Sequence, residues 1–289
     1  MSESPLEQAR VQLAALREEA RSGALIPAHL PEQIDAVLAL LAAAETPAGP
    51  EAAAEAARQE RARTAELIST AVHEMRIPLT SIRGYIDMLA KGMLGALPDQ
   101  QQQFAETIRV NALRLERLIA DINDYIKLRG GRLHLNRQPE TVGNVMLGVQ
   151  RRVADLAAER NVTFTCDAPE GLPLLNIDSP RLAQALVYLV ENAVNYSPNG
   201  STVTVTVRGD SGGVTFAVSD RGIGMSAAEL AHLGEPFWRA EAEAVREIKG
   251  HGLGFAVARG IIEAHGGTLA VESTPGQGTT IRFTLSALT

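Results

Sequence analysis

Cysteine is almost absent from this sequence, and long apolar runs are missing. Cys166 is the only cysteine among 289 residues, which excludes an internal disulfide and a thiolate metal cluster. Its strand-like setting, VTFTC, favours a buried structural thiol. The longest apolar run, IDAVLALLAAA at 34–44, is too short to span a membrane and contains Asp35. The first residues, MSESPLEQAR, lack the basic and apolar regions of a signal peptide. We therefore expect a cytoplasmic protein without a transmembrane segment.

Basic runs and aromatic residues are also scarce. Aromatic residues make up 4% of the chain, the formal net charge is -7, and no basic run is interleaved with aromatic residues. This composition excludes nucleic acid as a natural partner. The phosphate-binding pattern G-x-x-x-x-G-K-[ST] does not occur either, so the chain is not a P-loop protein. The chain does contain 45% hydrophobic residues, enough for packed cores in about two domains.

The hydrophobic pattern changes along the chain and predicts three parts. Residues 1–58 are predicted to be an N-terminal helical input segment and linker, with helices at 4–21 and 31–44 before the break ETPAGPEAAAEAARQE. Residues 59–131 are predicted to form a helical hairpin, and residues 132–289 a mixed domain. In that domain we expect helices at 142–159, 179–195 and 252–264 and strands at 161–166, 201–208, 213–219, 268–273 and 279–285. This order predicts an α+β fold in which one helical layer covers a largely antiparallel sheet.

The predicted hairpin carries a titratable pair beside an apolar stripe. Steps of four and three define a heptad seam at Ile68, Val72, Met75, Leu79, Ile82, Ile86 and Leu89. His73 directly follows a seam residue, so it is turned toward an accessible flank, next to Glu74. Pro78 lacks an amide hydrogen, and we therefore expect the helix to bend or loosen about one turn beyond His73.

A second seam follows the turn KGMLGALPDQ. It consists of Phe104, Ile108, Asn111, Leu115, Leu118, Ile122 and Tyr125. Two helices alone leave half of such a seam exposed, so we expect a homodimer in which two hairpins form a four-helix bundle, with Asn111 a candidate for fixing its register. Taken alone, the hairpin also fits a plain dimerisation element in which His73 is a solvated surface residue.

Two asparagines near the end of a helix are the first candidate ligand contacts of the mixed domain. Asn192 and Asn195, in YLVENAVNYSPNGS, are three residues apart and share a helix face. Their amide oxygens suit Mg²⁺, which keeps several waters and needs few protein ligands when phosphates supply the others. A polar helix end with asparagine as a stop signal explains the same pattern.

Two glycine-rich stretches complete a predicted nucleotide site. In VTFAVSDRGIGM a strand delivers Asp220, whose carboxylate can accept a hydrogen bond from an exocyclic amine such as that of adenine, and Gly222 and Gly224 allow a ligand close to the backbone. The stretch IKGHGLGF opens a helix whose amides and dipole suit a phosphate chain, at Gly250, Gly252 and Gly254. A dinucleotide site is the weaker alternative: GIGMSA fits G-x-G-x-x-A, but WRAEAEAVREIKG beyond it is polar and lacks the next strand of a βαβ unit.

Five ordered motifs between about residue 60 and residue 289 resemble those of the sensor histidine kinases of bacterial two-component systems. HEMRIPL resembles the phosphoacceptor box, NAVNYSP the asparagine box, DRGIGM the first glycine box and EPFWRA the phenylalanine box. GHGLGFAVARGIIEAHGG and STPGQGTTIRFTL resemble the remaining glycine boxes and closing strands. The resemblance implies a catalytic domain of the ATPase superfamily shared with gyrase and related chaperones, with an adenine pocket under a mobile lid.

The resemblance also implies roles for individual residues. His73 would accept the γ-phosphoryl group of ATP, and Glu74 would hold the other ring nitrogen and assist proton removal. Asn192 would hold Mg²⁺, and Asp220 would bind the adenine amine. The implied ATP contacts are Asn192, Asn195, Tyr196, Asp220, Gly222, Gly224, Phe237, Arg239, Lys249, Gly250, Gly252, Leu253, Gly254 and Thr279.

The same resemblance implies a lid and protein partners. The lid would be residues 225–249, with Phe237 as its anchor and Arg239 or Lys249 as candidate phosphate contacts. The phosphoryl group would pass to an aspartate in the receiver domain of a separate response regulator. An upstream sensor protein is a further candidate partner.

Three residues depart from the family pattern. Tyr188 stands where a polar residue usually precedes Asn192 by one turn, so ATP turnover is expected to be slow or differently assisted. Asn195 replaces a common lysine, and Ile77 occupies the position of a residue that orients water in family members with phosphatase activity. A degenerate, nucleotide-binding dimeric scaffold is therefore one alternative to a kinase, and an ATP-driven clamp or chaperone of the same superfamily is another.

Overall fold

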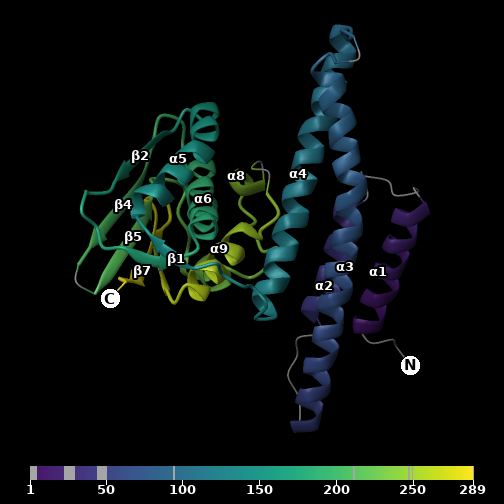
Figure 1. The fold of residues 1–289 in the computed structure, drawn as a ribbon, viewed down its shortest axis with the longest axis horizontal. Coiled ribbons are helices and arrows are strands. Elements are labelled where there is room, and N and C mark those ends of the chain that lie inside the picture. Colours follow the sequence, from purple (N-terminus) through teal and green to yellow (C-terminus); the bar gives the residue numbers. More distant parts are fainter. Residues whose placement is uncertain are drawn as a thin grey trace. The chain divides into compact units, whose positions relative to one another are not determined.

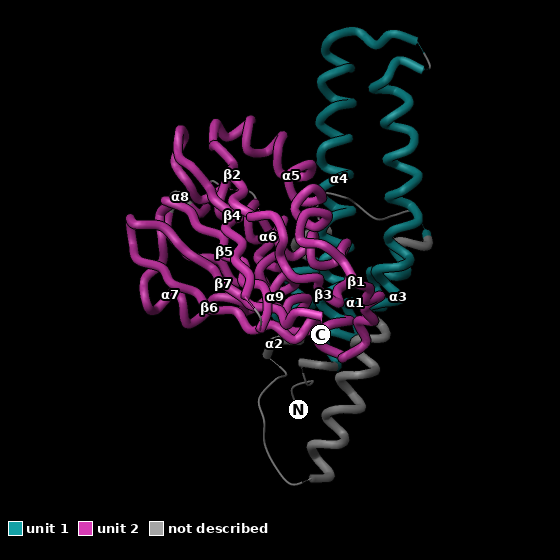
Figure 2. Tube along the Cα trace, turned by 60° about the vertical axis from the view of Figure 1, so that its left-hand side comes forward, with its two compact units in different colours: residues 1–126 teal, residues 127–289 magenta. Residues whose placement is uncertain are grey.

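The chain folds into two compact units in a computed structural model that describes residues 5–22, 30–43, 51–93, 95–210, 212–246, 248 and 250–288. The units are residues 1–126 and 127–289 (Figure 2). None of the helices within the described residues is long and apolar enough to cross a membrane.

The named elements of the first unit are all helices. It contains α1 (Pro5–Ser22), α2 (Leu30–Ala43), α3 (Glu51–Ala90) and most of α4 (Asp99–Arg129), so the two N-terminal helices and the hairpin lie where the sequence predicts them. The predicted linker is wrong in one respect, because α3 begins at Glu51 and includes the last part of the expected break. Alanine, glutamate, glutamine and arginine dominate that part, and all four are strong helix formers. The helix also continues through Pro78.

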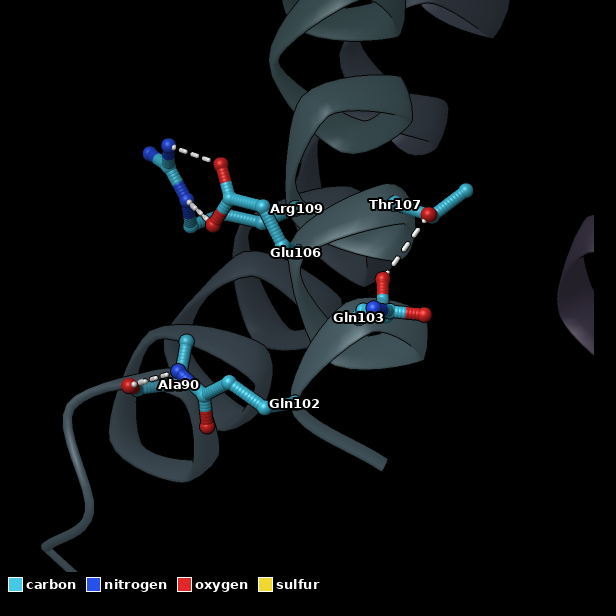
Figure 3. A network of polar contacts seen from close by, with 6 residues as sticks. All are labelled: Ala90, Gln102, Gln103, Glu106, Thr107 and Arg109. Carbon is cyan, nitrogen blue, oxygen red and sulfur yellow. Dashed lines mark hydrogen bonds and ion pairs between the residues drawn. The ribbon is translucent and has the colours of Figure 1, made fainter. Parts of the chain in front are cut away.

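Helices α3 and α4 pair side by side as a hairpin (Figure 1). The buried residues of α4 include four at intervals of seven positions, which are Ala105, Ala112, Ile119 and Ile126. At the turn between the helices, Gln102 Nε2 donates a hydrogen bond to the Ala90 carbonyl at 2.9 Å (Figure 3). Further along, Arg83 and Glu116 form an ion pair at 2.7 Å. These two polar contacts link the two helices of the hairpin.

The second unit is an α/β sandwich, as the sequence predicts. Its elements are β1 (Gln138–Glu140), α5 (Val142–Glu159), β2 (Thr163–Asp167), β3 (Leu175–Ile177), α6 (Ser179–Asn195), β4 (Thr202–Gly209), β5 (Gly213–Ser219), α7 (Ala227–His232), α8 (Glu243–Arg246), α9 (Gly254–Ala264), β6 (Leu269–Thr274) and β7 (Gly278–Ser286). The main sheet has five strands in the order β2-β4-β5-β7-β6, with β2 parallel to β4 and the other pairs antiparallel. Strands β1 and β3 form a separate antiparallel pair.

Helices α5, α6 and α9 form one layer on this sheet (Figure 1). Alternating strand residues face that layer, and Phe216 of β5 lies between Val207 of β4 and Phe283 of β7 in register. The two phenylalanine rings stack with centroids 5.0 Å apart. The stacked rings pack between β5 and β7, and the ends of these two strands carry the site described below.

The last turn of α4 belongs to the second unit. The side chain of Leu128 fills the space beside Gly260 of α9, where a Cβ would approach Leu128 Cδ1 to 2.8 Å. The structure therefore divides the chain after Ile126, slightly before the predicted domain boundary after residue 131.

Candidate functional site

Asp220 lies immediately after β5 and is held by two backbone amides. Its Oδ1 atom accepts hydrogen bonds from the amides of Gly222 at 2.8 Å and Thr279 at 3.1 Å. Its own amide donates to the Thr279 carbonyl at 2.9 Å. Both side-chain bonds end on Oδ1, so the carboxylate is oriented and Oδ2 is the oxygen available to a ligand.

The surroundings of Asp220 favour a partner that donates a hydrogen bond. Burial raises the pKa of its carboxyl above the ordinary value, and the hydrogen bonds from Gly222 and Thr279 oppose that shift. A partly desolvated carboxylate is stabilised by a further N–H donor. An exocyclic amine is a donor of this kind.

Glycines line the turn after Asp220 because other residues do not fit. A Cβ on Gly222 would lie 2.4 Å from the Tyr196 carbonyl oxygen, and one on Gly224 would lie 2.0 Å from that of Thr274. Gly224 also has a φ of +63°. The turn is therefore pressed against the end of α6 and the end of β6, which leaves its backbone closely packed beside Asp220.

Ser273 of β6 and Gly278 of β7 pack beside this turn and were not among the predicted contacts. Gly278 has a φ of +94°, and a Cβ there would lie 2.2 Å from the Asp220 carbonyl oxygen. The Ser273 hydroxyl accepts from the Met225 amide at 2.9 Å and lies 2.8 Å from the Thr279 hydroxyl. Both residues lie in the quoted motif STPGQGTTIRFTL, but Thr279 was the one residue of that motif predicted to contact ATP.

The first turn of α9 is suited to a phosphate chain. Its N-cap is Leu253, a fully buried hydrocarbon side chain that has no acceptor for the amides of the first turn. Gly254 follows, and a Cβ there would lie 3.1 Å from Tyr188 Cδ1 on α6. The amides and dipole at this end of the helix therefore favour an anionic ligand, and α6 forms the neighbouring wall.

Helix α6 brings Tyr188, Asn192 and Tyr196 to this wall at intervals of one turn. Asn192 and Asn195 are half-buried and precede the C-cap residue Tyr196, whose amide donates to the Asn192 carbonyl at 3.0 Å. The Tyr196 carbonyl accepts from the Ile223 amide at 3.1 Å, which ties the end of α6 to the Asp220 turn. Tyr188 itself is buried and its hydroxyl accepts from Gln184 Nε2 at 3.4 Å.

The predicted lid contains a strained anchor at Phe237. Its φ of 63° is unusual for a residue with a side chain, and its amide donates to the Gly252 carbonyl at 3.2 Å. A Cβ on Gly252, which has a φ of +72°, would lie 2.7 Å from the Phe237 carbonyl carbon. The lid and the loop before α9 are thus held together by backbone contact.

Of the two predicted phosphate contacts in the lid, Arg239 and Lys249, the structure describes Arg239. The Arg239 guanidinium donates to the carbonyls of Gly250 at 3.0 Å and Ile248 at 2.5 Å, and also to that of Val245. In this conformation Arg239 therefore holds the lid together. Lys249 lies outside the residues that the structure describes.

His73 and Glu74 lie on α3 in the first unit. The His73 side chain is exposed and the Glu74 side chain is half-buried, as expected for positions on the flank of the seam. Among the described residues, no group of three or more His, Cys, Asp and Glu side chains is placed to hold a metal ion. Cys166 is half-buried, and burial raises the pKa of its thiol, which disfavours a reactive thiolate.

Two family models match the chain. The "His Kinase A (phospho-acceptor) domain" matches residues 63–131, and "Histidine kinase-, DNA gyrase B-, and HSP90-like ATPase" matches residues 177–289. The chain belongs to the sensor histidine kinases of two-component systems. The first match contains His73 and the second contains Asp220 and the first turn of α9, so the predicted resemblance is confirmed.

Relatives of this histidine kinase are similar over most of its length. An uncharacterized sensor-like histidine kinase of Rhizobium meliloti is 32% identical, over 81% of this chain and 45% of the relative. The histidine protein kinase DivJ of Caulobacter vibrioides is 32% identical, over 78% and 37%. The crystal structure of full-length ShkA in complex with AMPPNP aligns with a TM-score of 0.64 at 25% identity, over 78% and 47%. The chain thus spans less than half the length of these proteins.

Proposed function

We propose that the chain is an ATP-dependent protein-histidine kinase that phosphorylates its own His73. The proposal rests above all on the Asp220 turn, where two amides orient a half-buried carboxylate in a glycine turn packed against the ends of α6 and β6. Such a site suits the adenine amine. The phosphate chain would lie at the first turn of α9, with Asn192, Asn195 and Tyr196 on the α6 wall.

Asn192 is the residue that would hold Mg²⁺. Its half-buried amide lies one turn beyond Tyr188, whose ring contacts the start of α9 where phosphates would bind. An amide oxygen fits Mg²⁺ because the ion keeps most of its ligands as water and phosphate oxygens. When bound, Mg²⁺ would neutralise charge on the phosphates.

His73 would act as the nucleophile toward the γ-phosphorus. The unprotonated ring nitrogen forms the new N–P bond while the bond from the γ-phosphorus to the bridging oxygen breaks, so ADP leaves with that electron pair. The proton on the other ring nitrogen is held by Glu74, which stabilises the positive charge that develops on the imidazole. Little covalent assistance is needed beyond this, because phosphoryl transfer depends mainly on positioning and charge neutralisation.

The phosphohistidine would pass its phosphoryl group to an aspartate in the receiver domain of a separate response regulator. That step forms an O–P bond, breaks the N–P bond and returns His73 to its neutral form. We further propose a homodimer formed by the α3–α4 hairpins, and a cytoplasmic location, where ATP is found. An upstream sensor protein would supply the signal.

The dephosphorylation of that regulator is proposed to be weak. Ile77 lies one turn beyond His73 and 58% of its side chain is exposed. A hydrocarbon at this accessible position cannot orient a hydrolytic water.

Tyr188 favours a second candidate, a nucleotide-binding scaffold without kinase activity. Its ring lies against Gly254 at the proposed phosphate site, and a phenol there cannot replace an amide or carboxylate that orients water. The scaffold would bind ATP without forming a phosphohistidine.

Incubation with γ-labelled ATP and Mg²⁺ separates these two candidates. The kinase forms an acid-labile, alkali-stable label that is lost in His73→Gln and retained in His134→Gln, a matched change at another exposed histidine. ATP binding with no label in the parent chain would support the scaffold instead.

A further inference from the structure

In the predicted heptad seam of the hairpin, residues near His73 are buried, whereas several residues near the turn are exposed and Ile86 there is 6% exposed. Near the turn between α3 and α4, the exposed fractions are 42% for Ile82, 60% for Phe104 and 48% for Ile108. Near His73, the corresponding fractions are 2% for Val72 and 3% for Ile122. Part of the seam is therefore buried within a single copy of the chain.

Helix α1 packs against both α2 and α3 (Figure 1), and both N-terminal helices contribute side chains to a cavity beside the seam residues near His73. Leu13 of α1 and Val37 of α2 line one apolar cavity together with Val72, Met75 and Ile122 of the hairpin. Leu13 is 9% exposed and Val37 is 3% exposed. Both helices therefore use their apolar faces to bury the same seam residues that a four-helix bundle would bury.

The helix pair α1–α2 and a second hairpin cannot both pack on the seam near Val72 and Ile122, because close-packed interiors leave no room for a second set of side chains. We propose that the helix pair α1–α2 competes with a second copy of the chain for the seam around His73. Two copies of the chain first associate through the exposed seam residues near the turn. When the two hairpins then pair along the whole seam, they displace α1–α2. This inference rests on the proposed function, since it assumes that the dimeric hairpin is the signalling form.

The exchange would also change the surroundings of the phosphoacceptor. Glu74 lines the same cavity and is half-buried, whereas the adjacent His73 is exposed. Arg17 of α1 is the other charged residue in the lining. Displacing α1 removes this cation and changes the solvent contact of Glu74, so the position of the helix pair is coupled to the residue proposed to hold the imidazole proton.

Single substitutions in the full chain test the competition. Leu13→Asp and Val37→Asp place a charge in the apolar contact and should release α1–α2, whereas Val11→Asp changes α1 at a position that is 64% exposed. Sedimentation equilibrium without nucleotide should show dimerisation tightened about tenfold or more in the first two variants and unchanged in the third. An unchanged or weaker dimer in Leu13→Asp and Val37→Asp would overturn the inference.

Hydrogen exchange on the parent chain tests it without any substitution. As the concentration rises through the dimer transition, amides of α1 should lose protection while those of residues 68–75 keep it. Protection of α1 that stays constant through the transition would overturn the inference, because the helix pair and the second copy would then bind together. Neither measurement uses ATP, so a chain that fails to label His73 leaves both results interpretable, and a labelled kinase with constant α1 protection contradicts only the competition.

Discussion

Asp220 and Thr279 are joined by two hydrogen bonds, one between their backbones and one from the Thr279 amide to the Asp220 side chain. The Asp220 amide donates to the Thr279 carbonyl at 2.9 Å, and the Thr279 amide donates to the Asp220 carboxylate at 3.1 Å. Asp220 follows β5 and Thr279 lies at the start of β7. These two strands are paired, and their residues Phe216 and Phe283 stack on each other. The apolar core thus fixes the carboxylate that we propose binds adenine.

Asp220→Asn should weaken ATP binding by about tenfold to a hundredfold, because an amide at Oδ2 presents a donor to the adenine amine and leaves it unpaired. Isothermal titration with ATP and Mg²⁺ measures the change. Asp155→Asn, at an exposed position on α5, is the matched control and should bind as the parent does. Equal affinity in all three proteins would contradict the assigned adenine contact.

Gly224→Ala should destabilise the second unit by about 1–3 kcal/mol and abolish ATP binding. The new Cβ would lie 2.0 Å from the Thr274 carbonyl oxygen, at a φ of +63° that alanine disfavours. Gly250→Ala is the control, because a Cβ there meets nothing within 4 Å. Urea unfolding measures the stability. A Gly224→Ala protein as stable as Gly250→Ala would show that the turn is not packed as described.

His265 should make the second unit less stable in acid. Its Nε2 accepts from the Asp178 amide at 3.0 Å and its Nδ1 donates to the Ile261 carbonyl at 2.8 Å, so the neutral ring is the form that fits. Burial lowers its pKa in the folded state, the Ile261 carbonyl opposes this shift, and of the charges nearby Arg137 lowers the pKa while Asp178 raises it. A lowered folded pKa means that the unfolded chain binds the proton more tightly.

The contribution of His265 is therefore fully present above the unfolded pKa of about 6.5 and is lost as the pH falls through the folded pKa. Unfolding free energies measured between pH 8 and pH 5 should fall more steeply in the parent chain than in His265→Gln. His134→Gln, an exposed control, should keep the parent slope. Identical slopes in the parent and His265→Gln would count against the neutral, buried ring.

Arg239→Gln should loosen the lid, because its guanidinium donates to the lid carbonyls of Val245 and Ile248 and to that of Gly250 beyond the lid. We expect trypsin to cleave after Arg246 several-fold faster in this variant. Arg282→Gln removes a surface ion pair with Glu272 on the sheet and should leave the cleavage rate unchanged. A lid equally resistant in Arg239→Gln would show that these contacts do not hold it.

Ile77→Thr should raise dephosphorylation of the regulator, since the hydroxyl can orient water beside His73. The position is 58% exposed, so the change should alter stability by less than about 0.5 kcal/mol. Release of phosphate from a phosphorylated regulator measures the effect, and Ile77→Val serves as the control. If Ile77→Thr and Ile77→Val released phosphate from the regulator at the same rate, Ile77 would not be the cause of the weak dephosphorylation.

The sequence predicts some elements closely because local residues encode their ends. Helices α5 and α6 begin where expected, after Thr141 and Asp178, whose side chains accept from the amides of Asn144 and Arg181. The five strands of the main sheet lie within two residues of their predicted bounds, since alternating apolar and polar residues mark most of them. The placement of Asp220 before a glycine turn follows from the same pattern.

Features that depend on distant contacts were not predictable. Strands β1 and β3 are three residues each and carry no alternation to detect. The positive φ of Phe237 and the role of Gly278 arise from backbone segments that meet only in the folded domain. The seam pattern predicts that Val72 and Ile122 are buried, but it cannot show that the covering residues come from α1 and α2 of the same chain.

The most direct test of the account is mass-spectrometric mapping of the phosphoryl group after the chain is incubated with ATP and Mg²⁺ and digested at neutral or alkaline pH. The account predicts phosphate on His73, absent in His73→Gln and reduced in Asp220→Asn. Phosphate on a different residue, or a His73 that stays unmodified while ATP is bound, would contradict it.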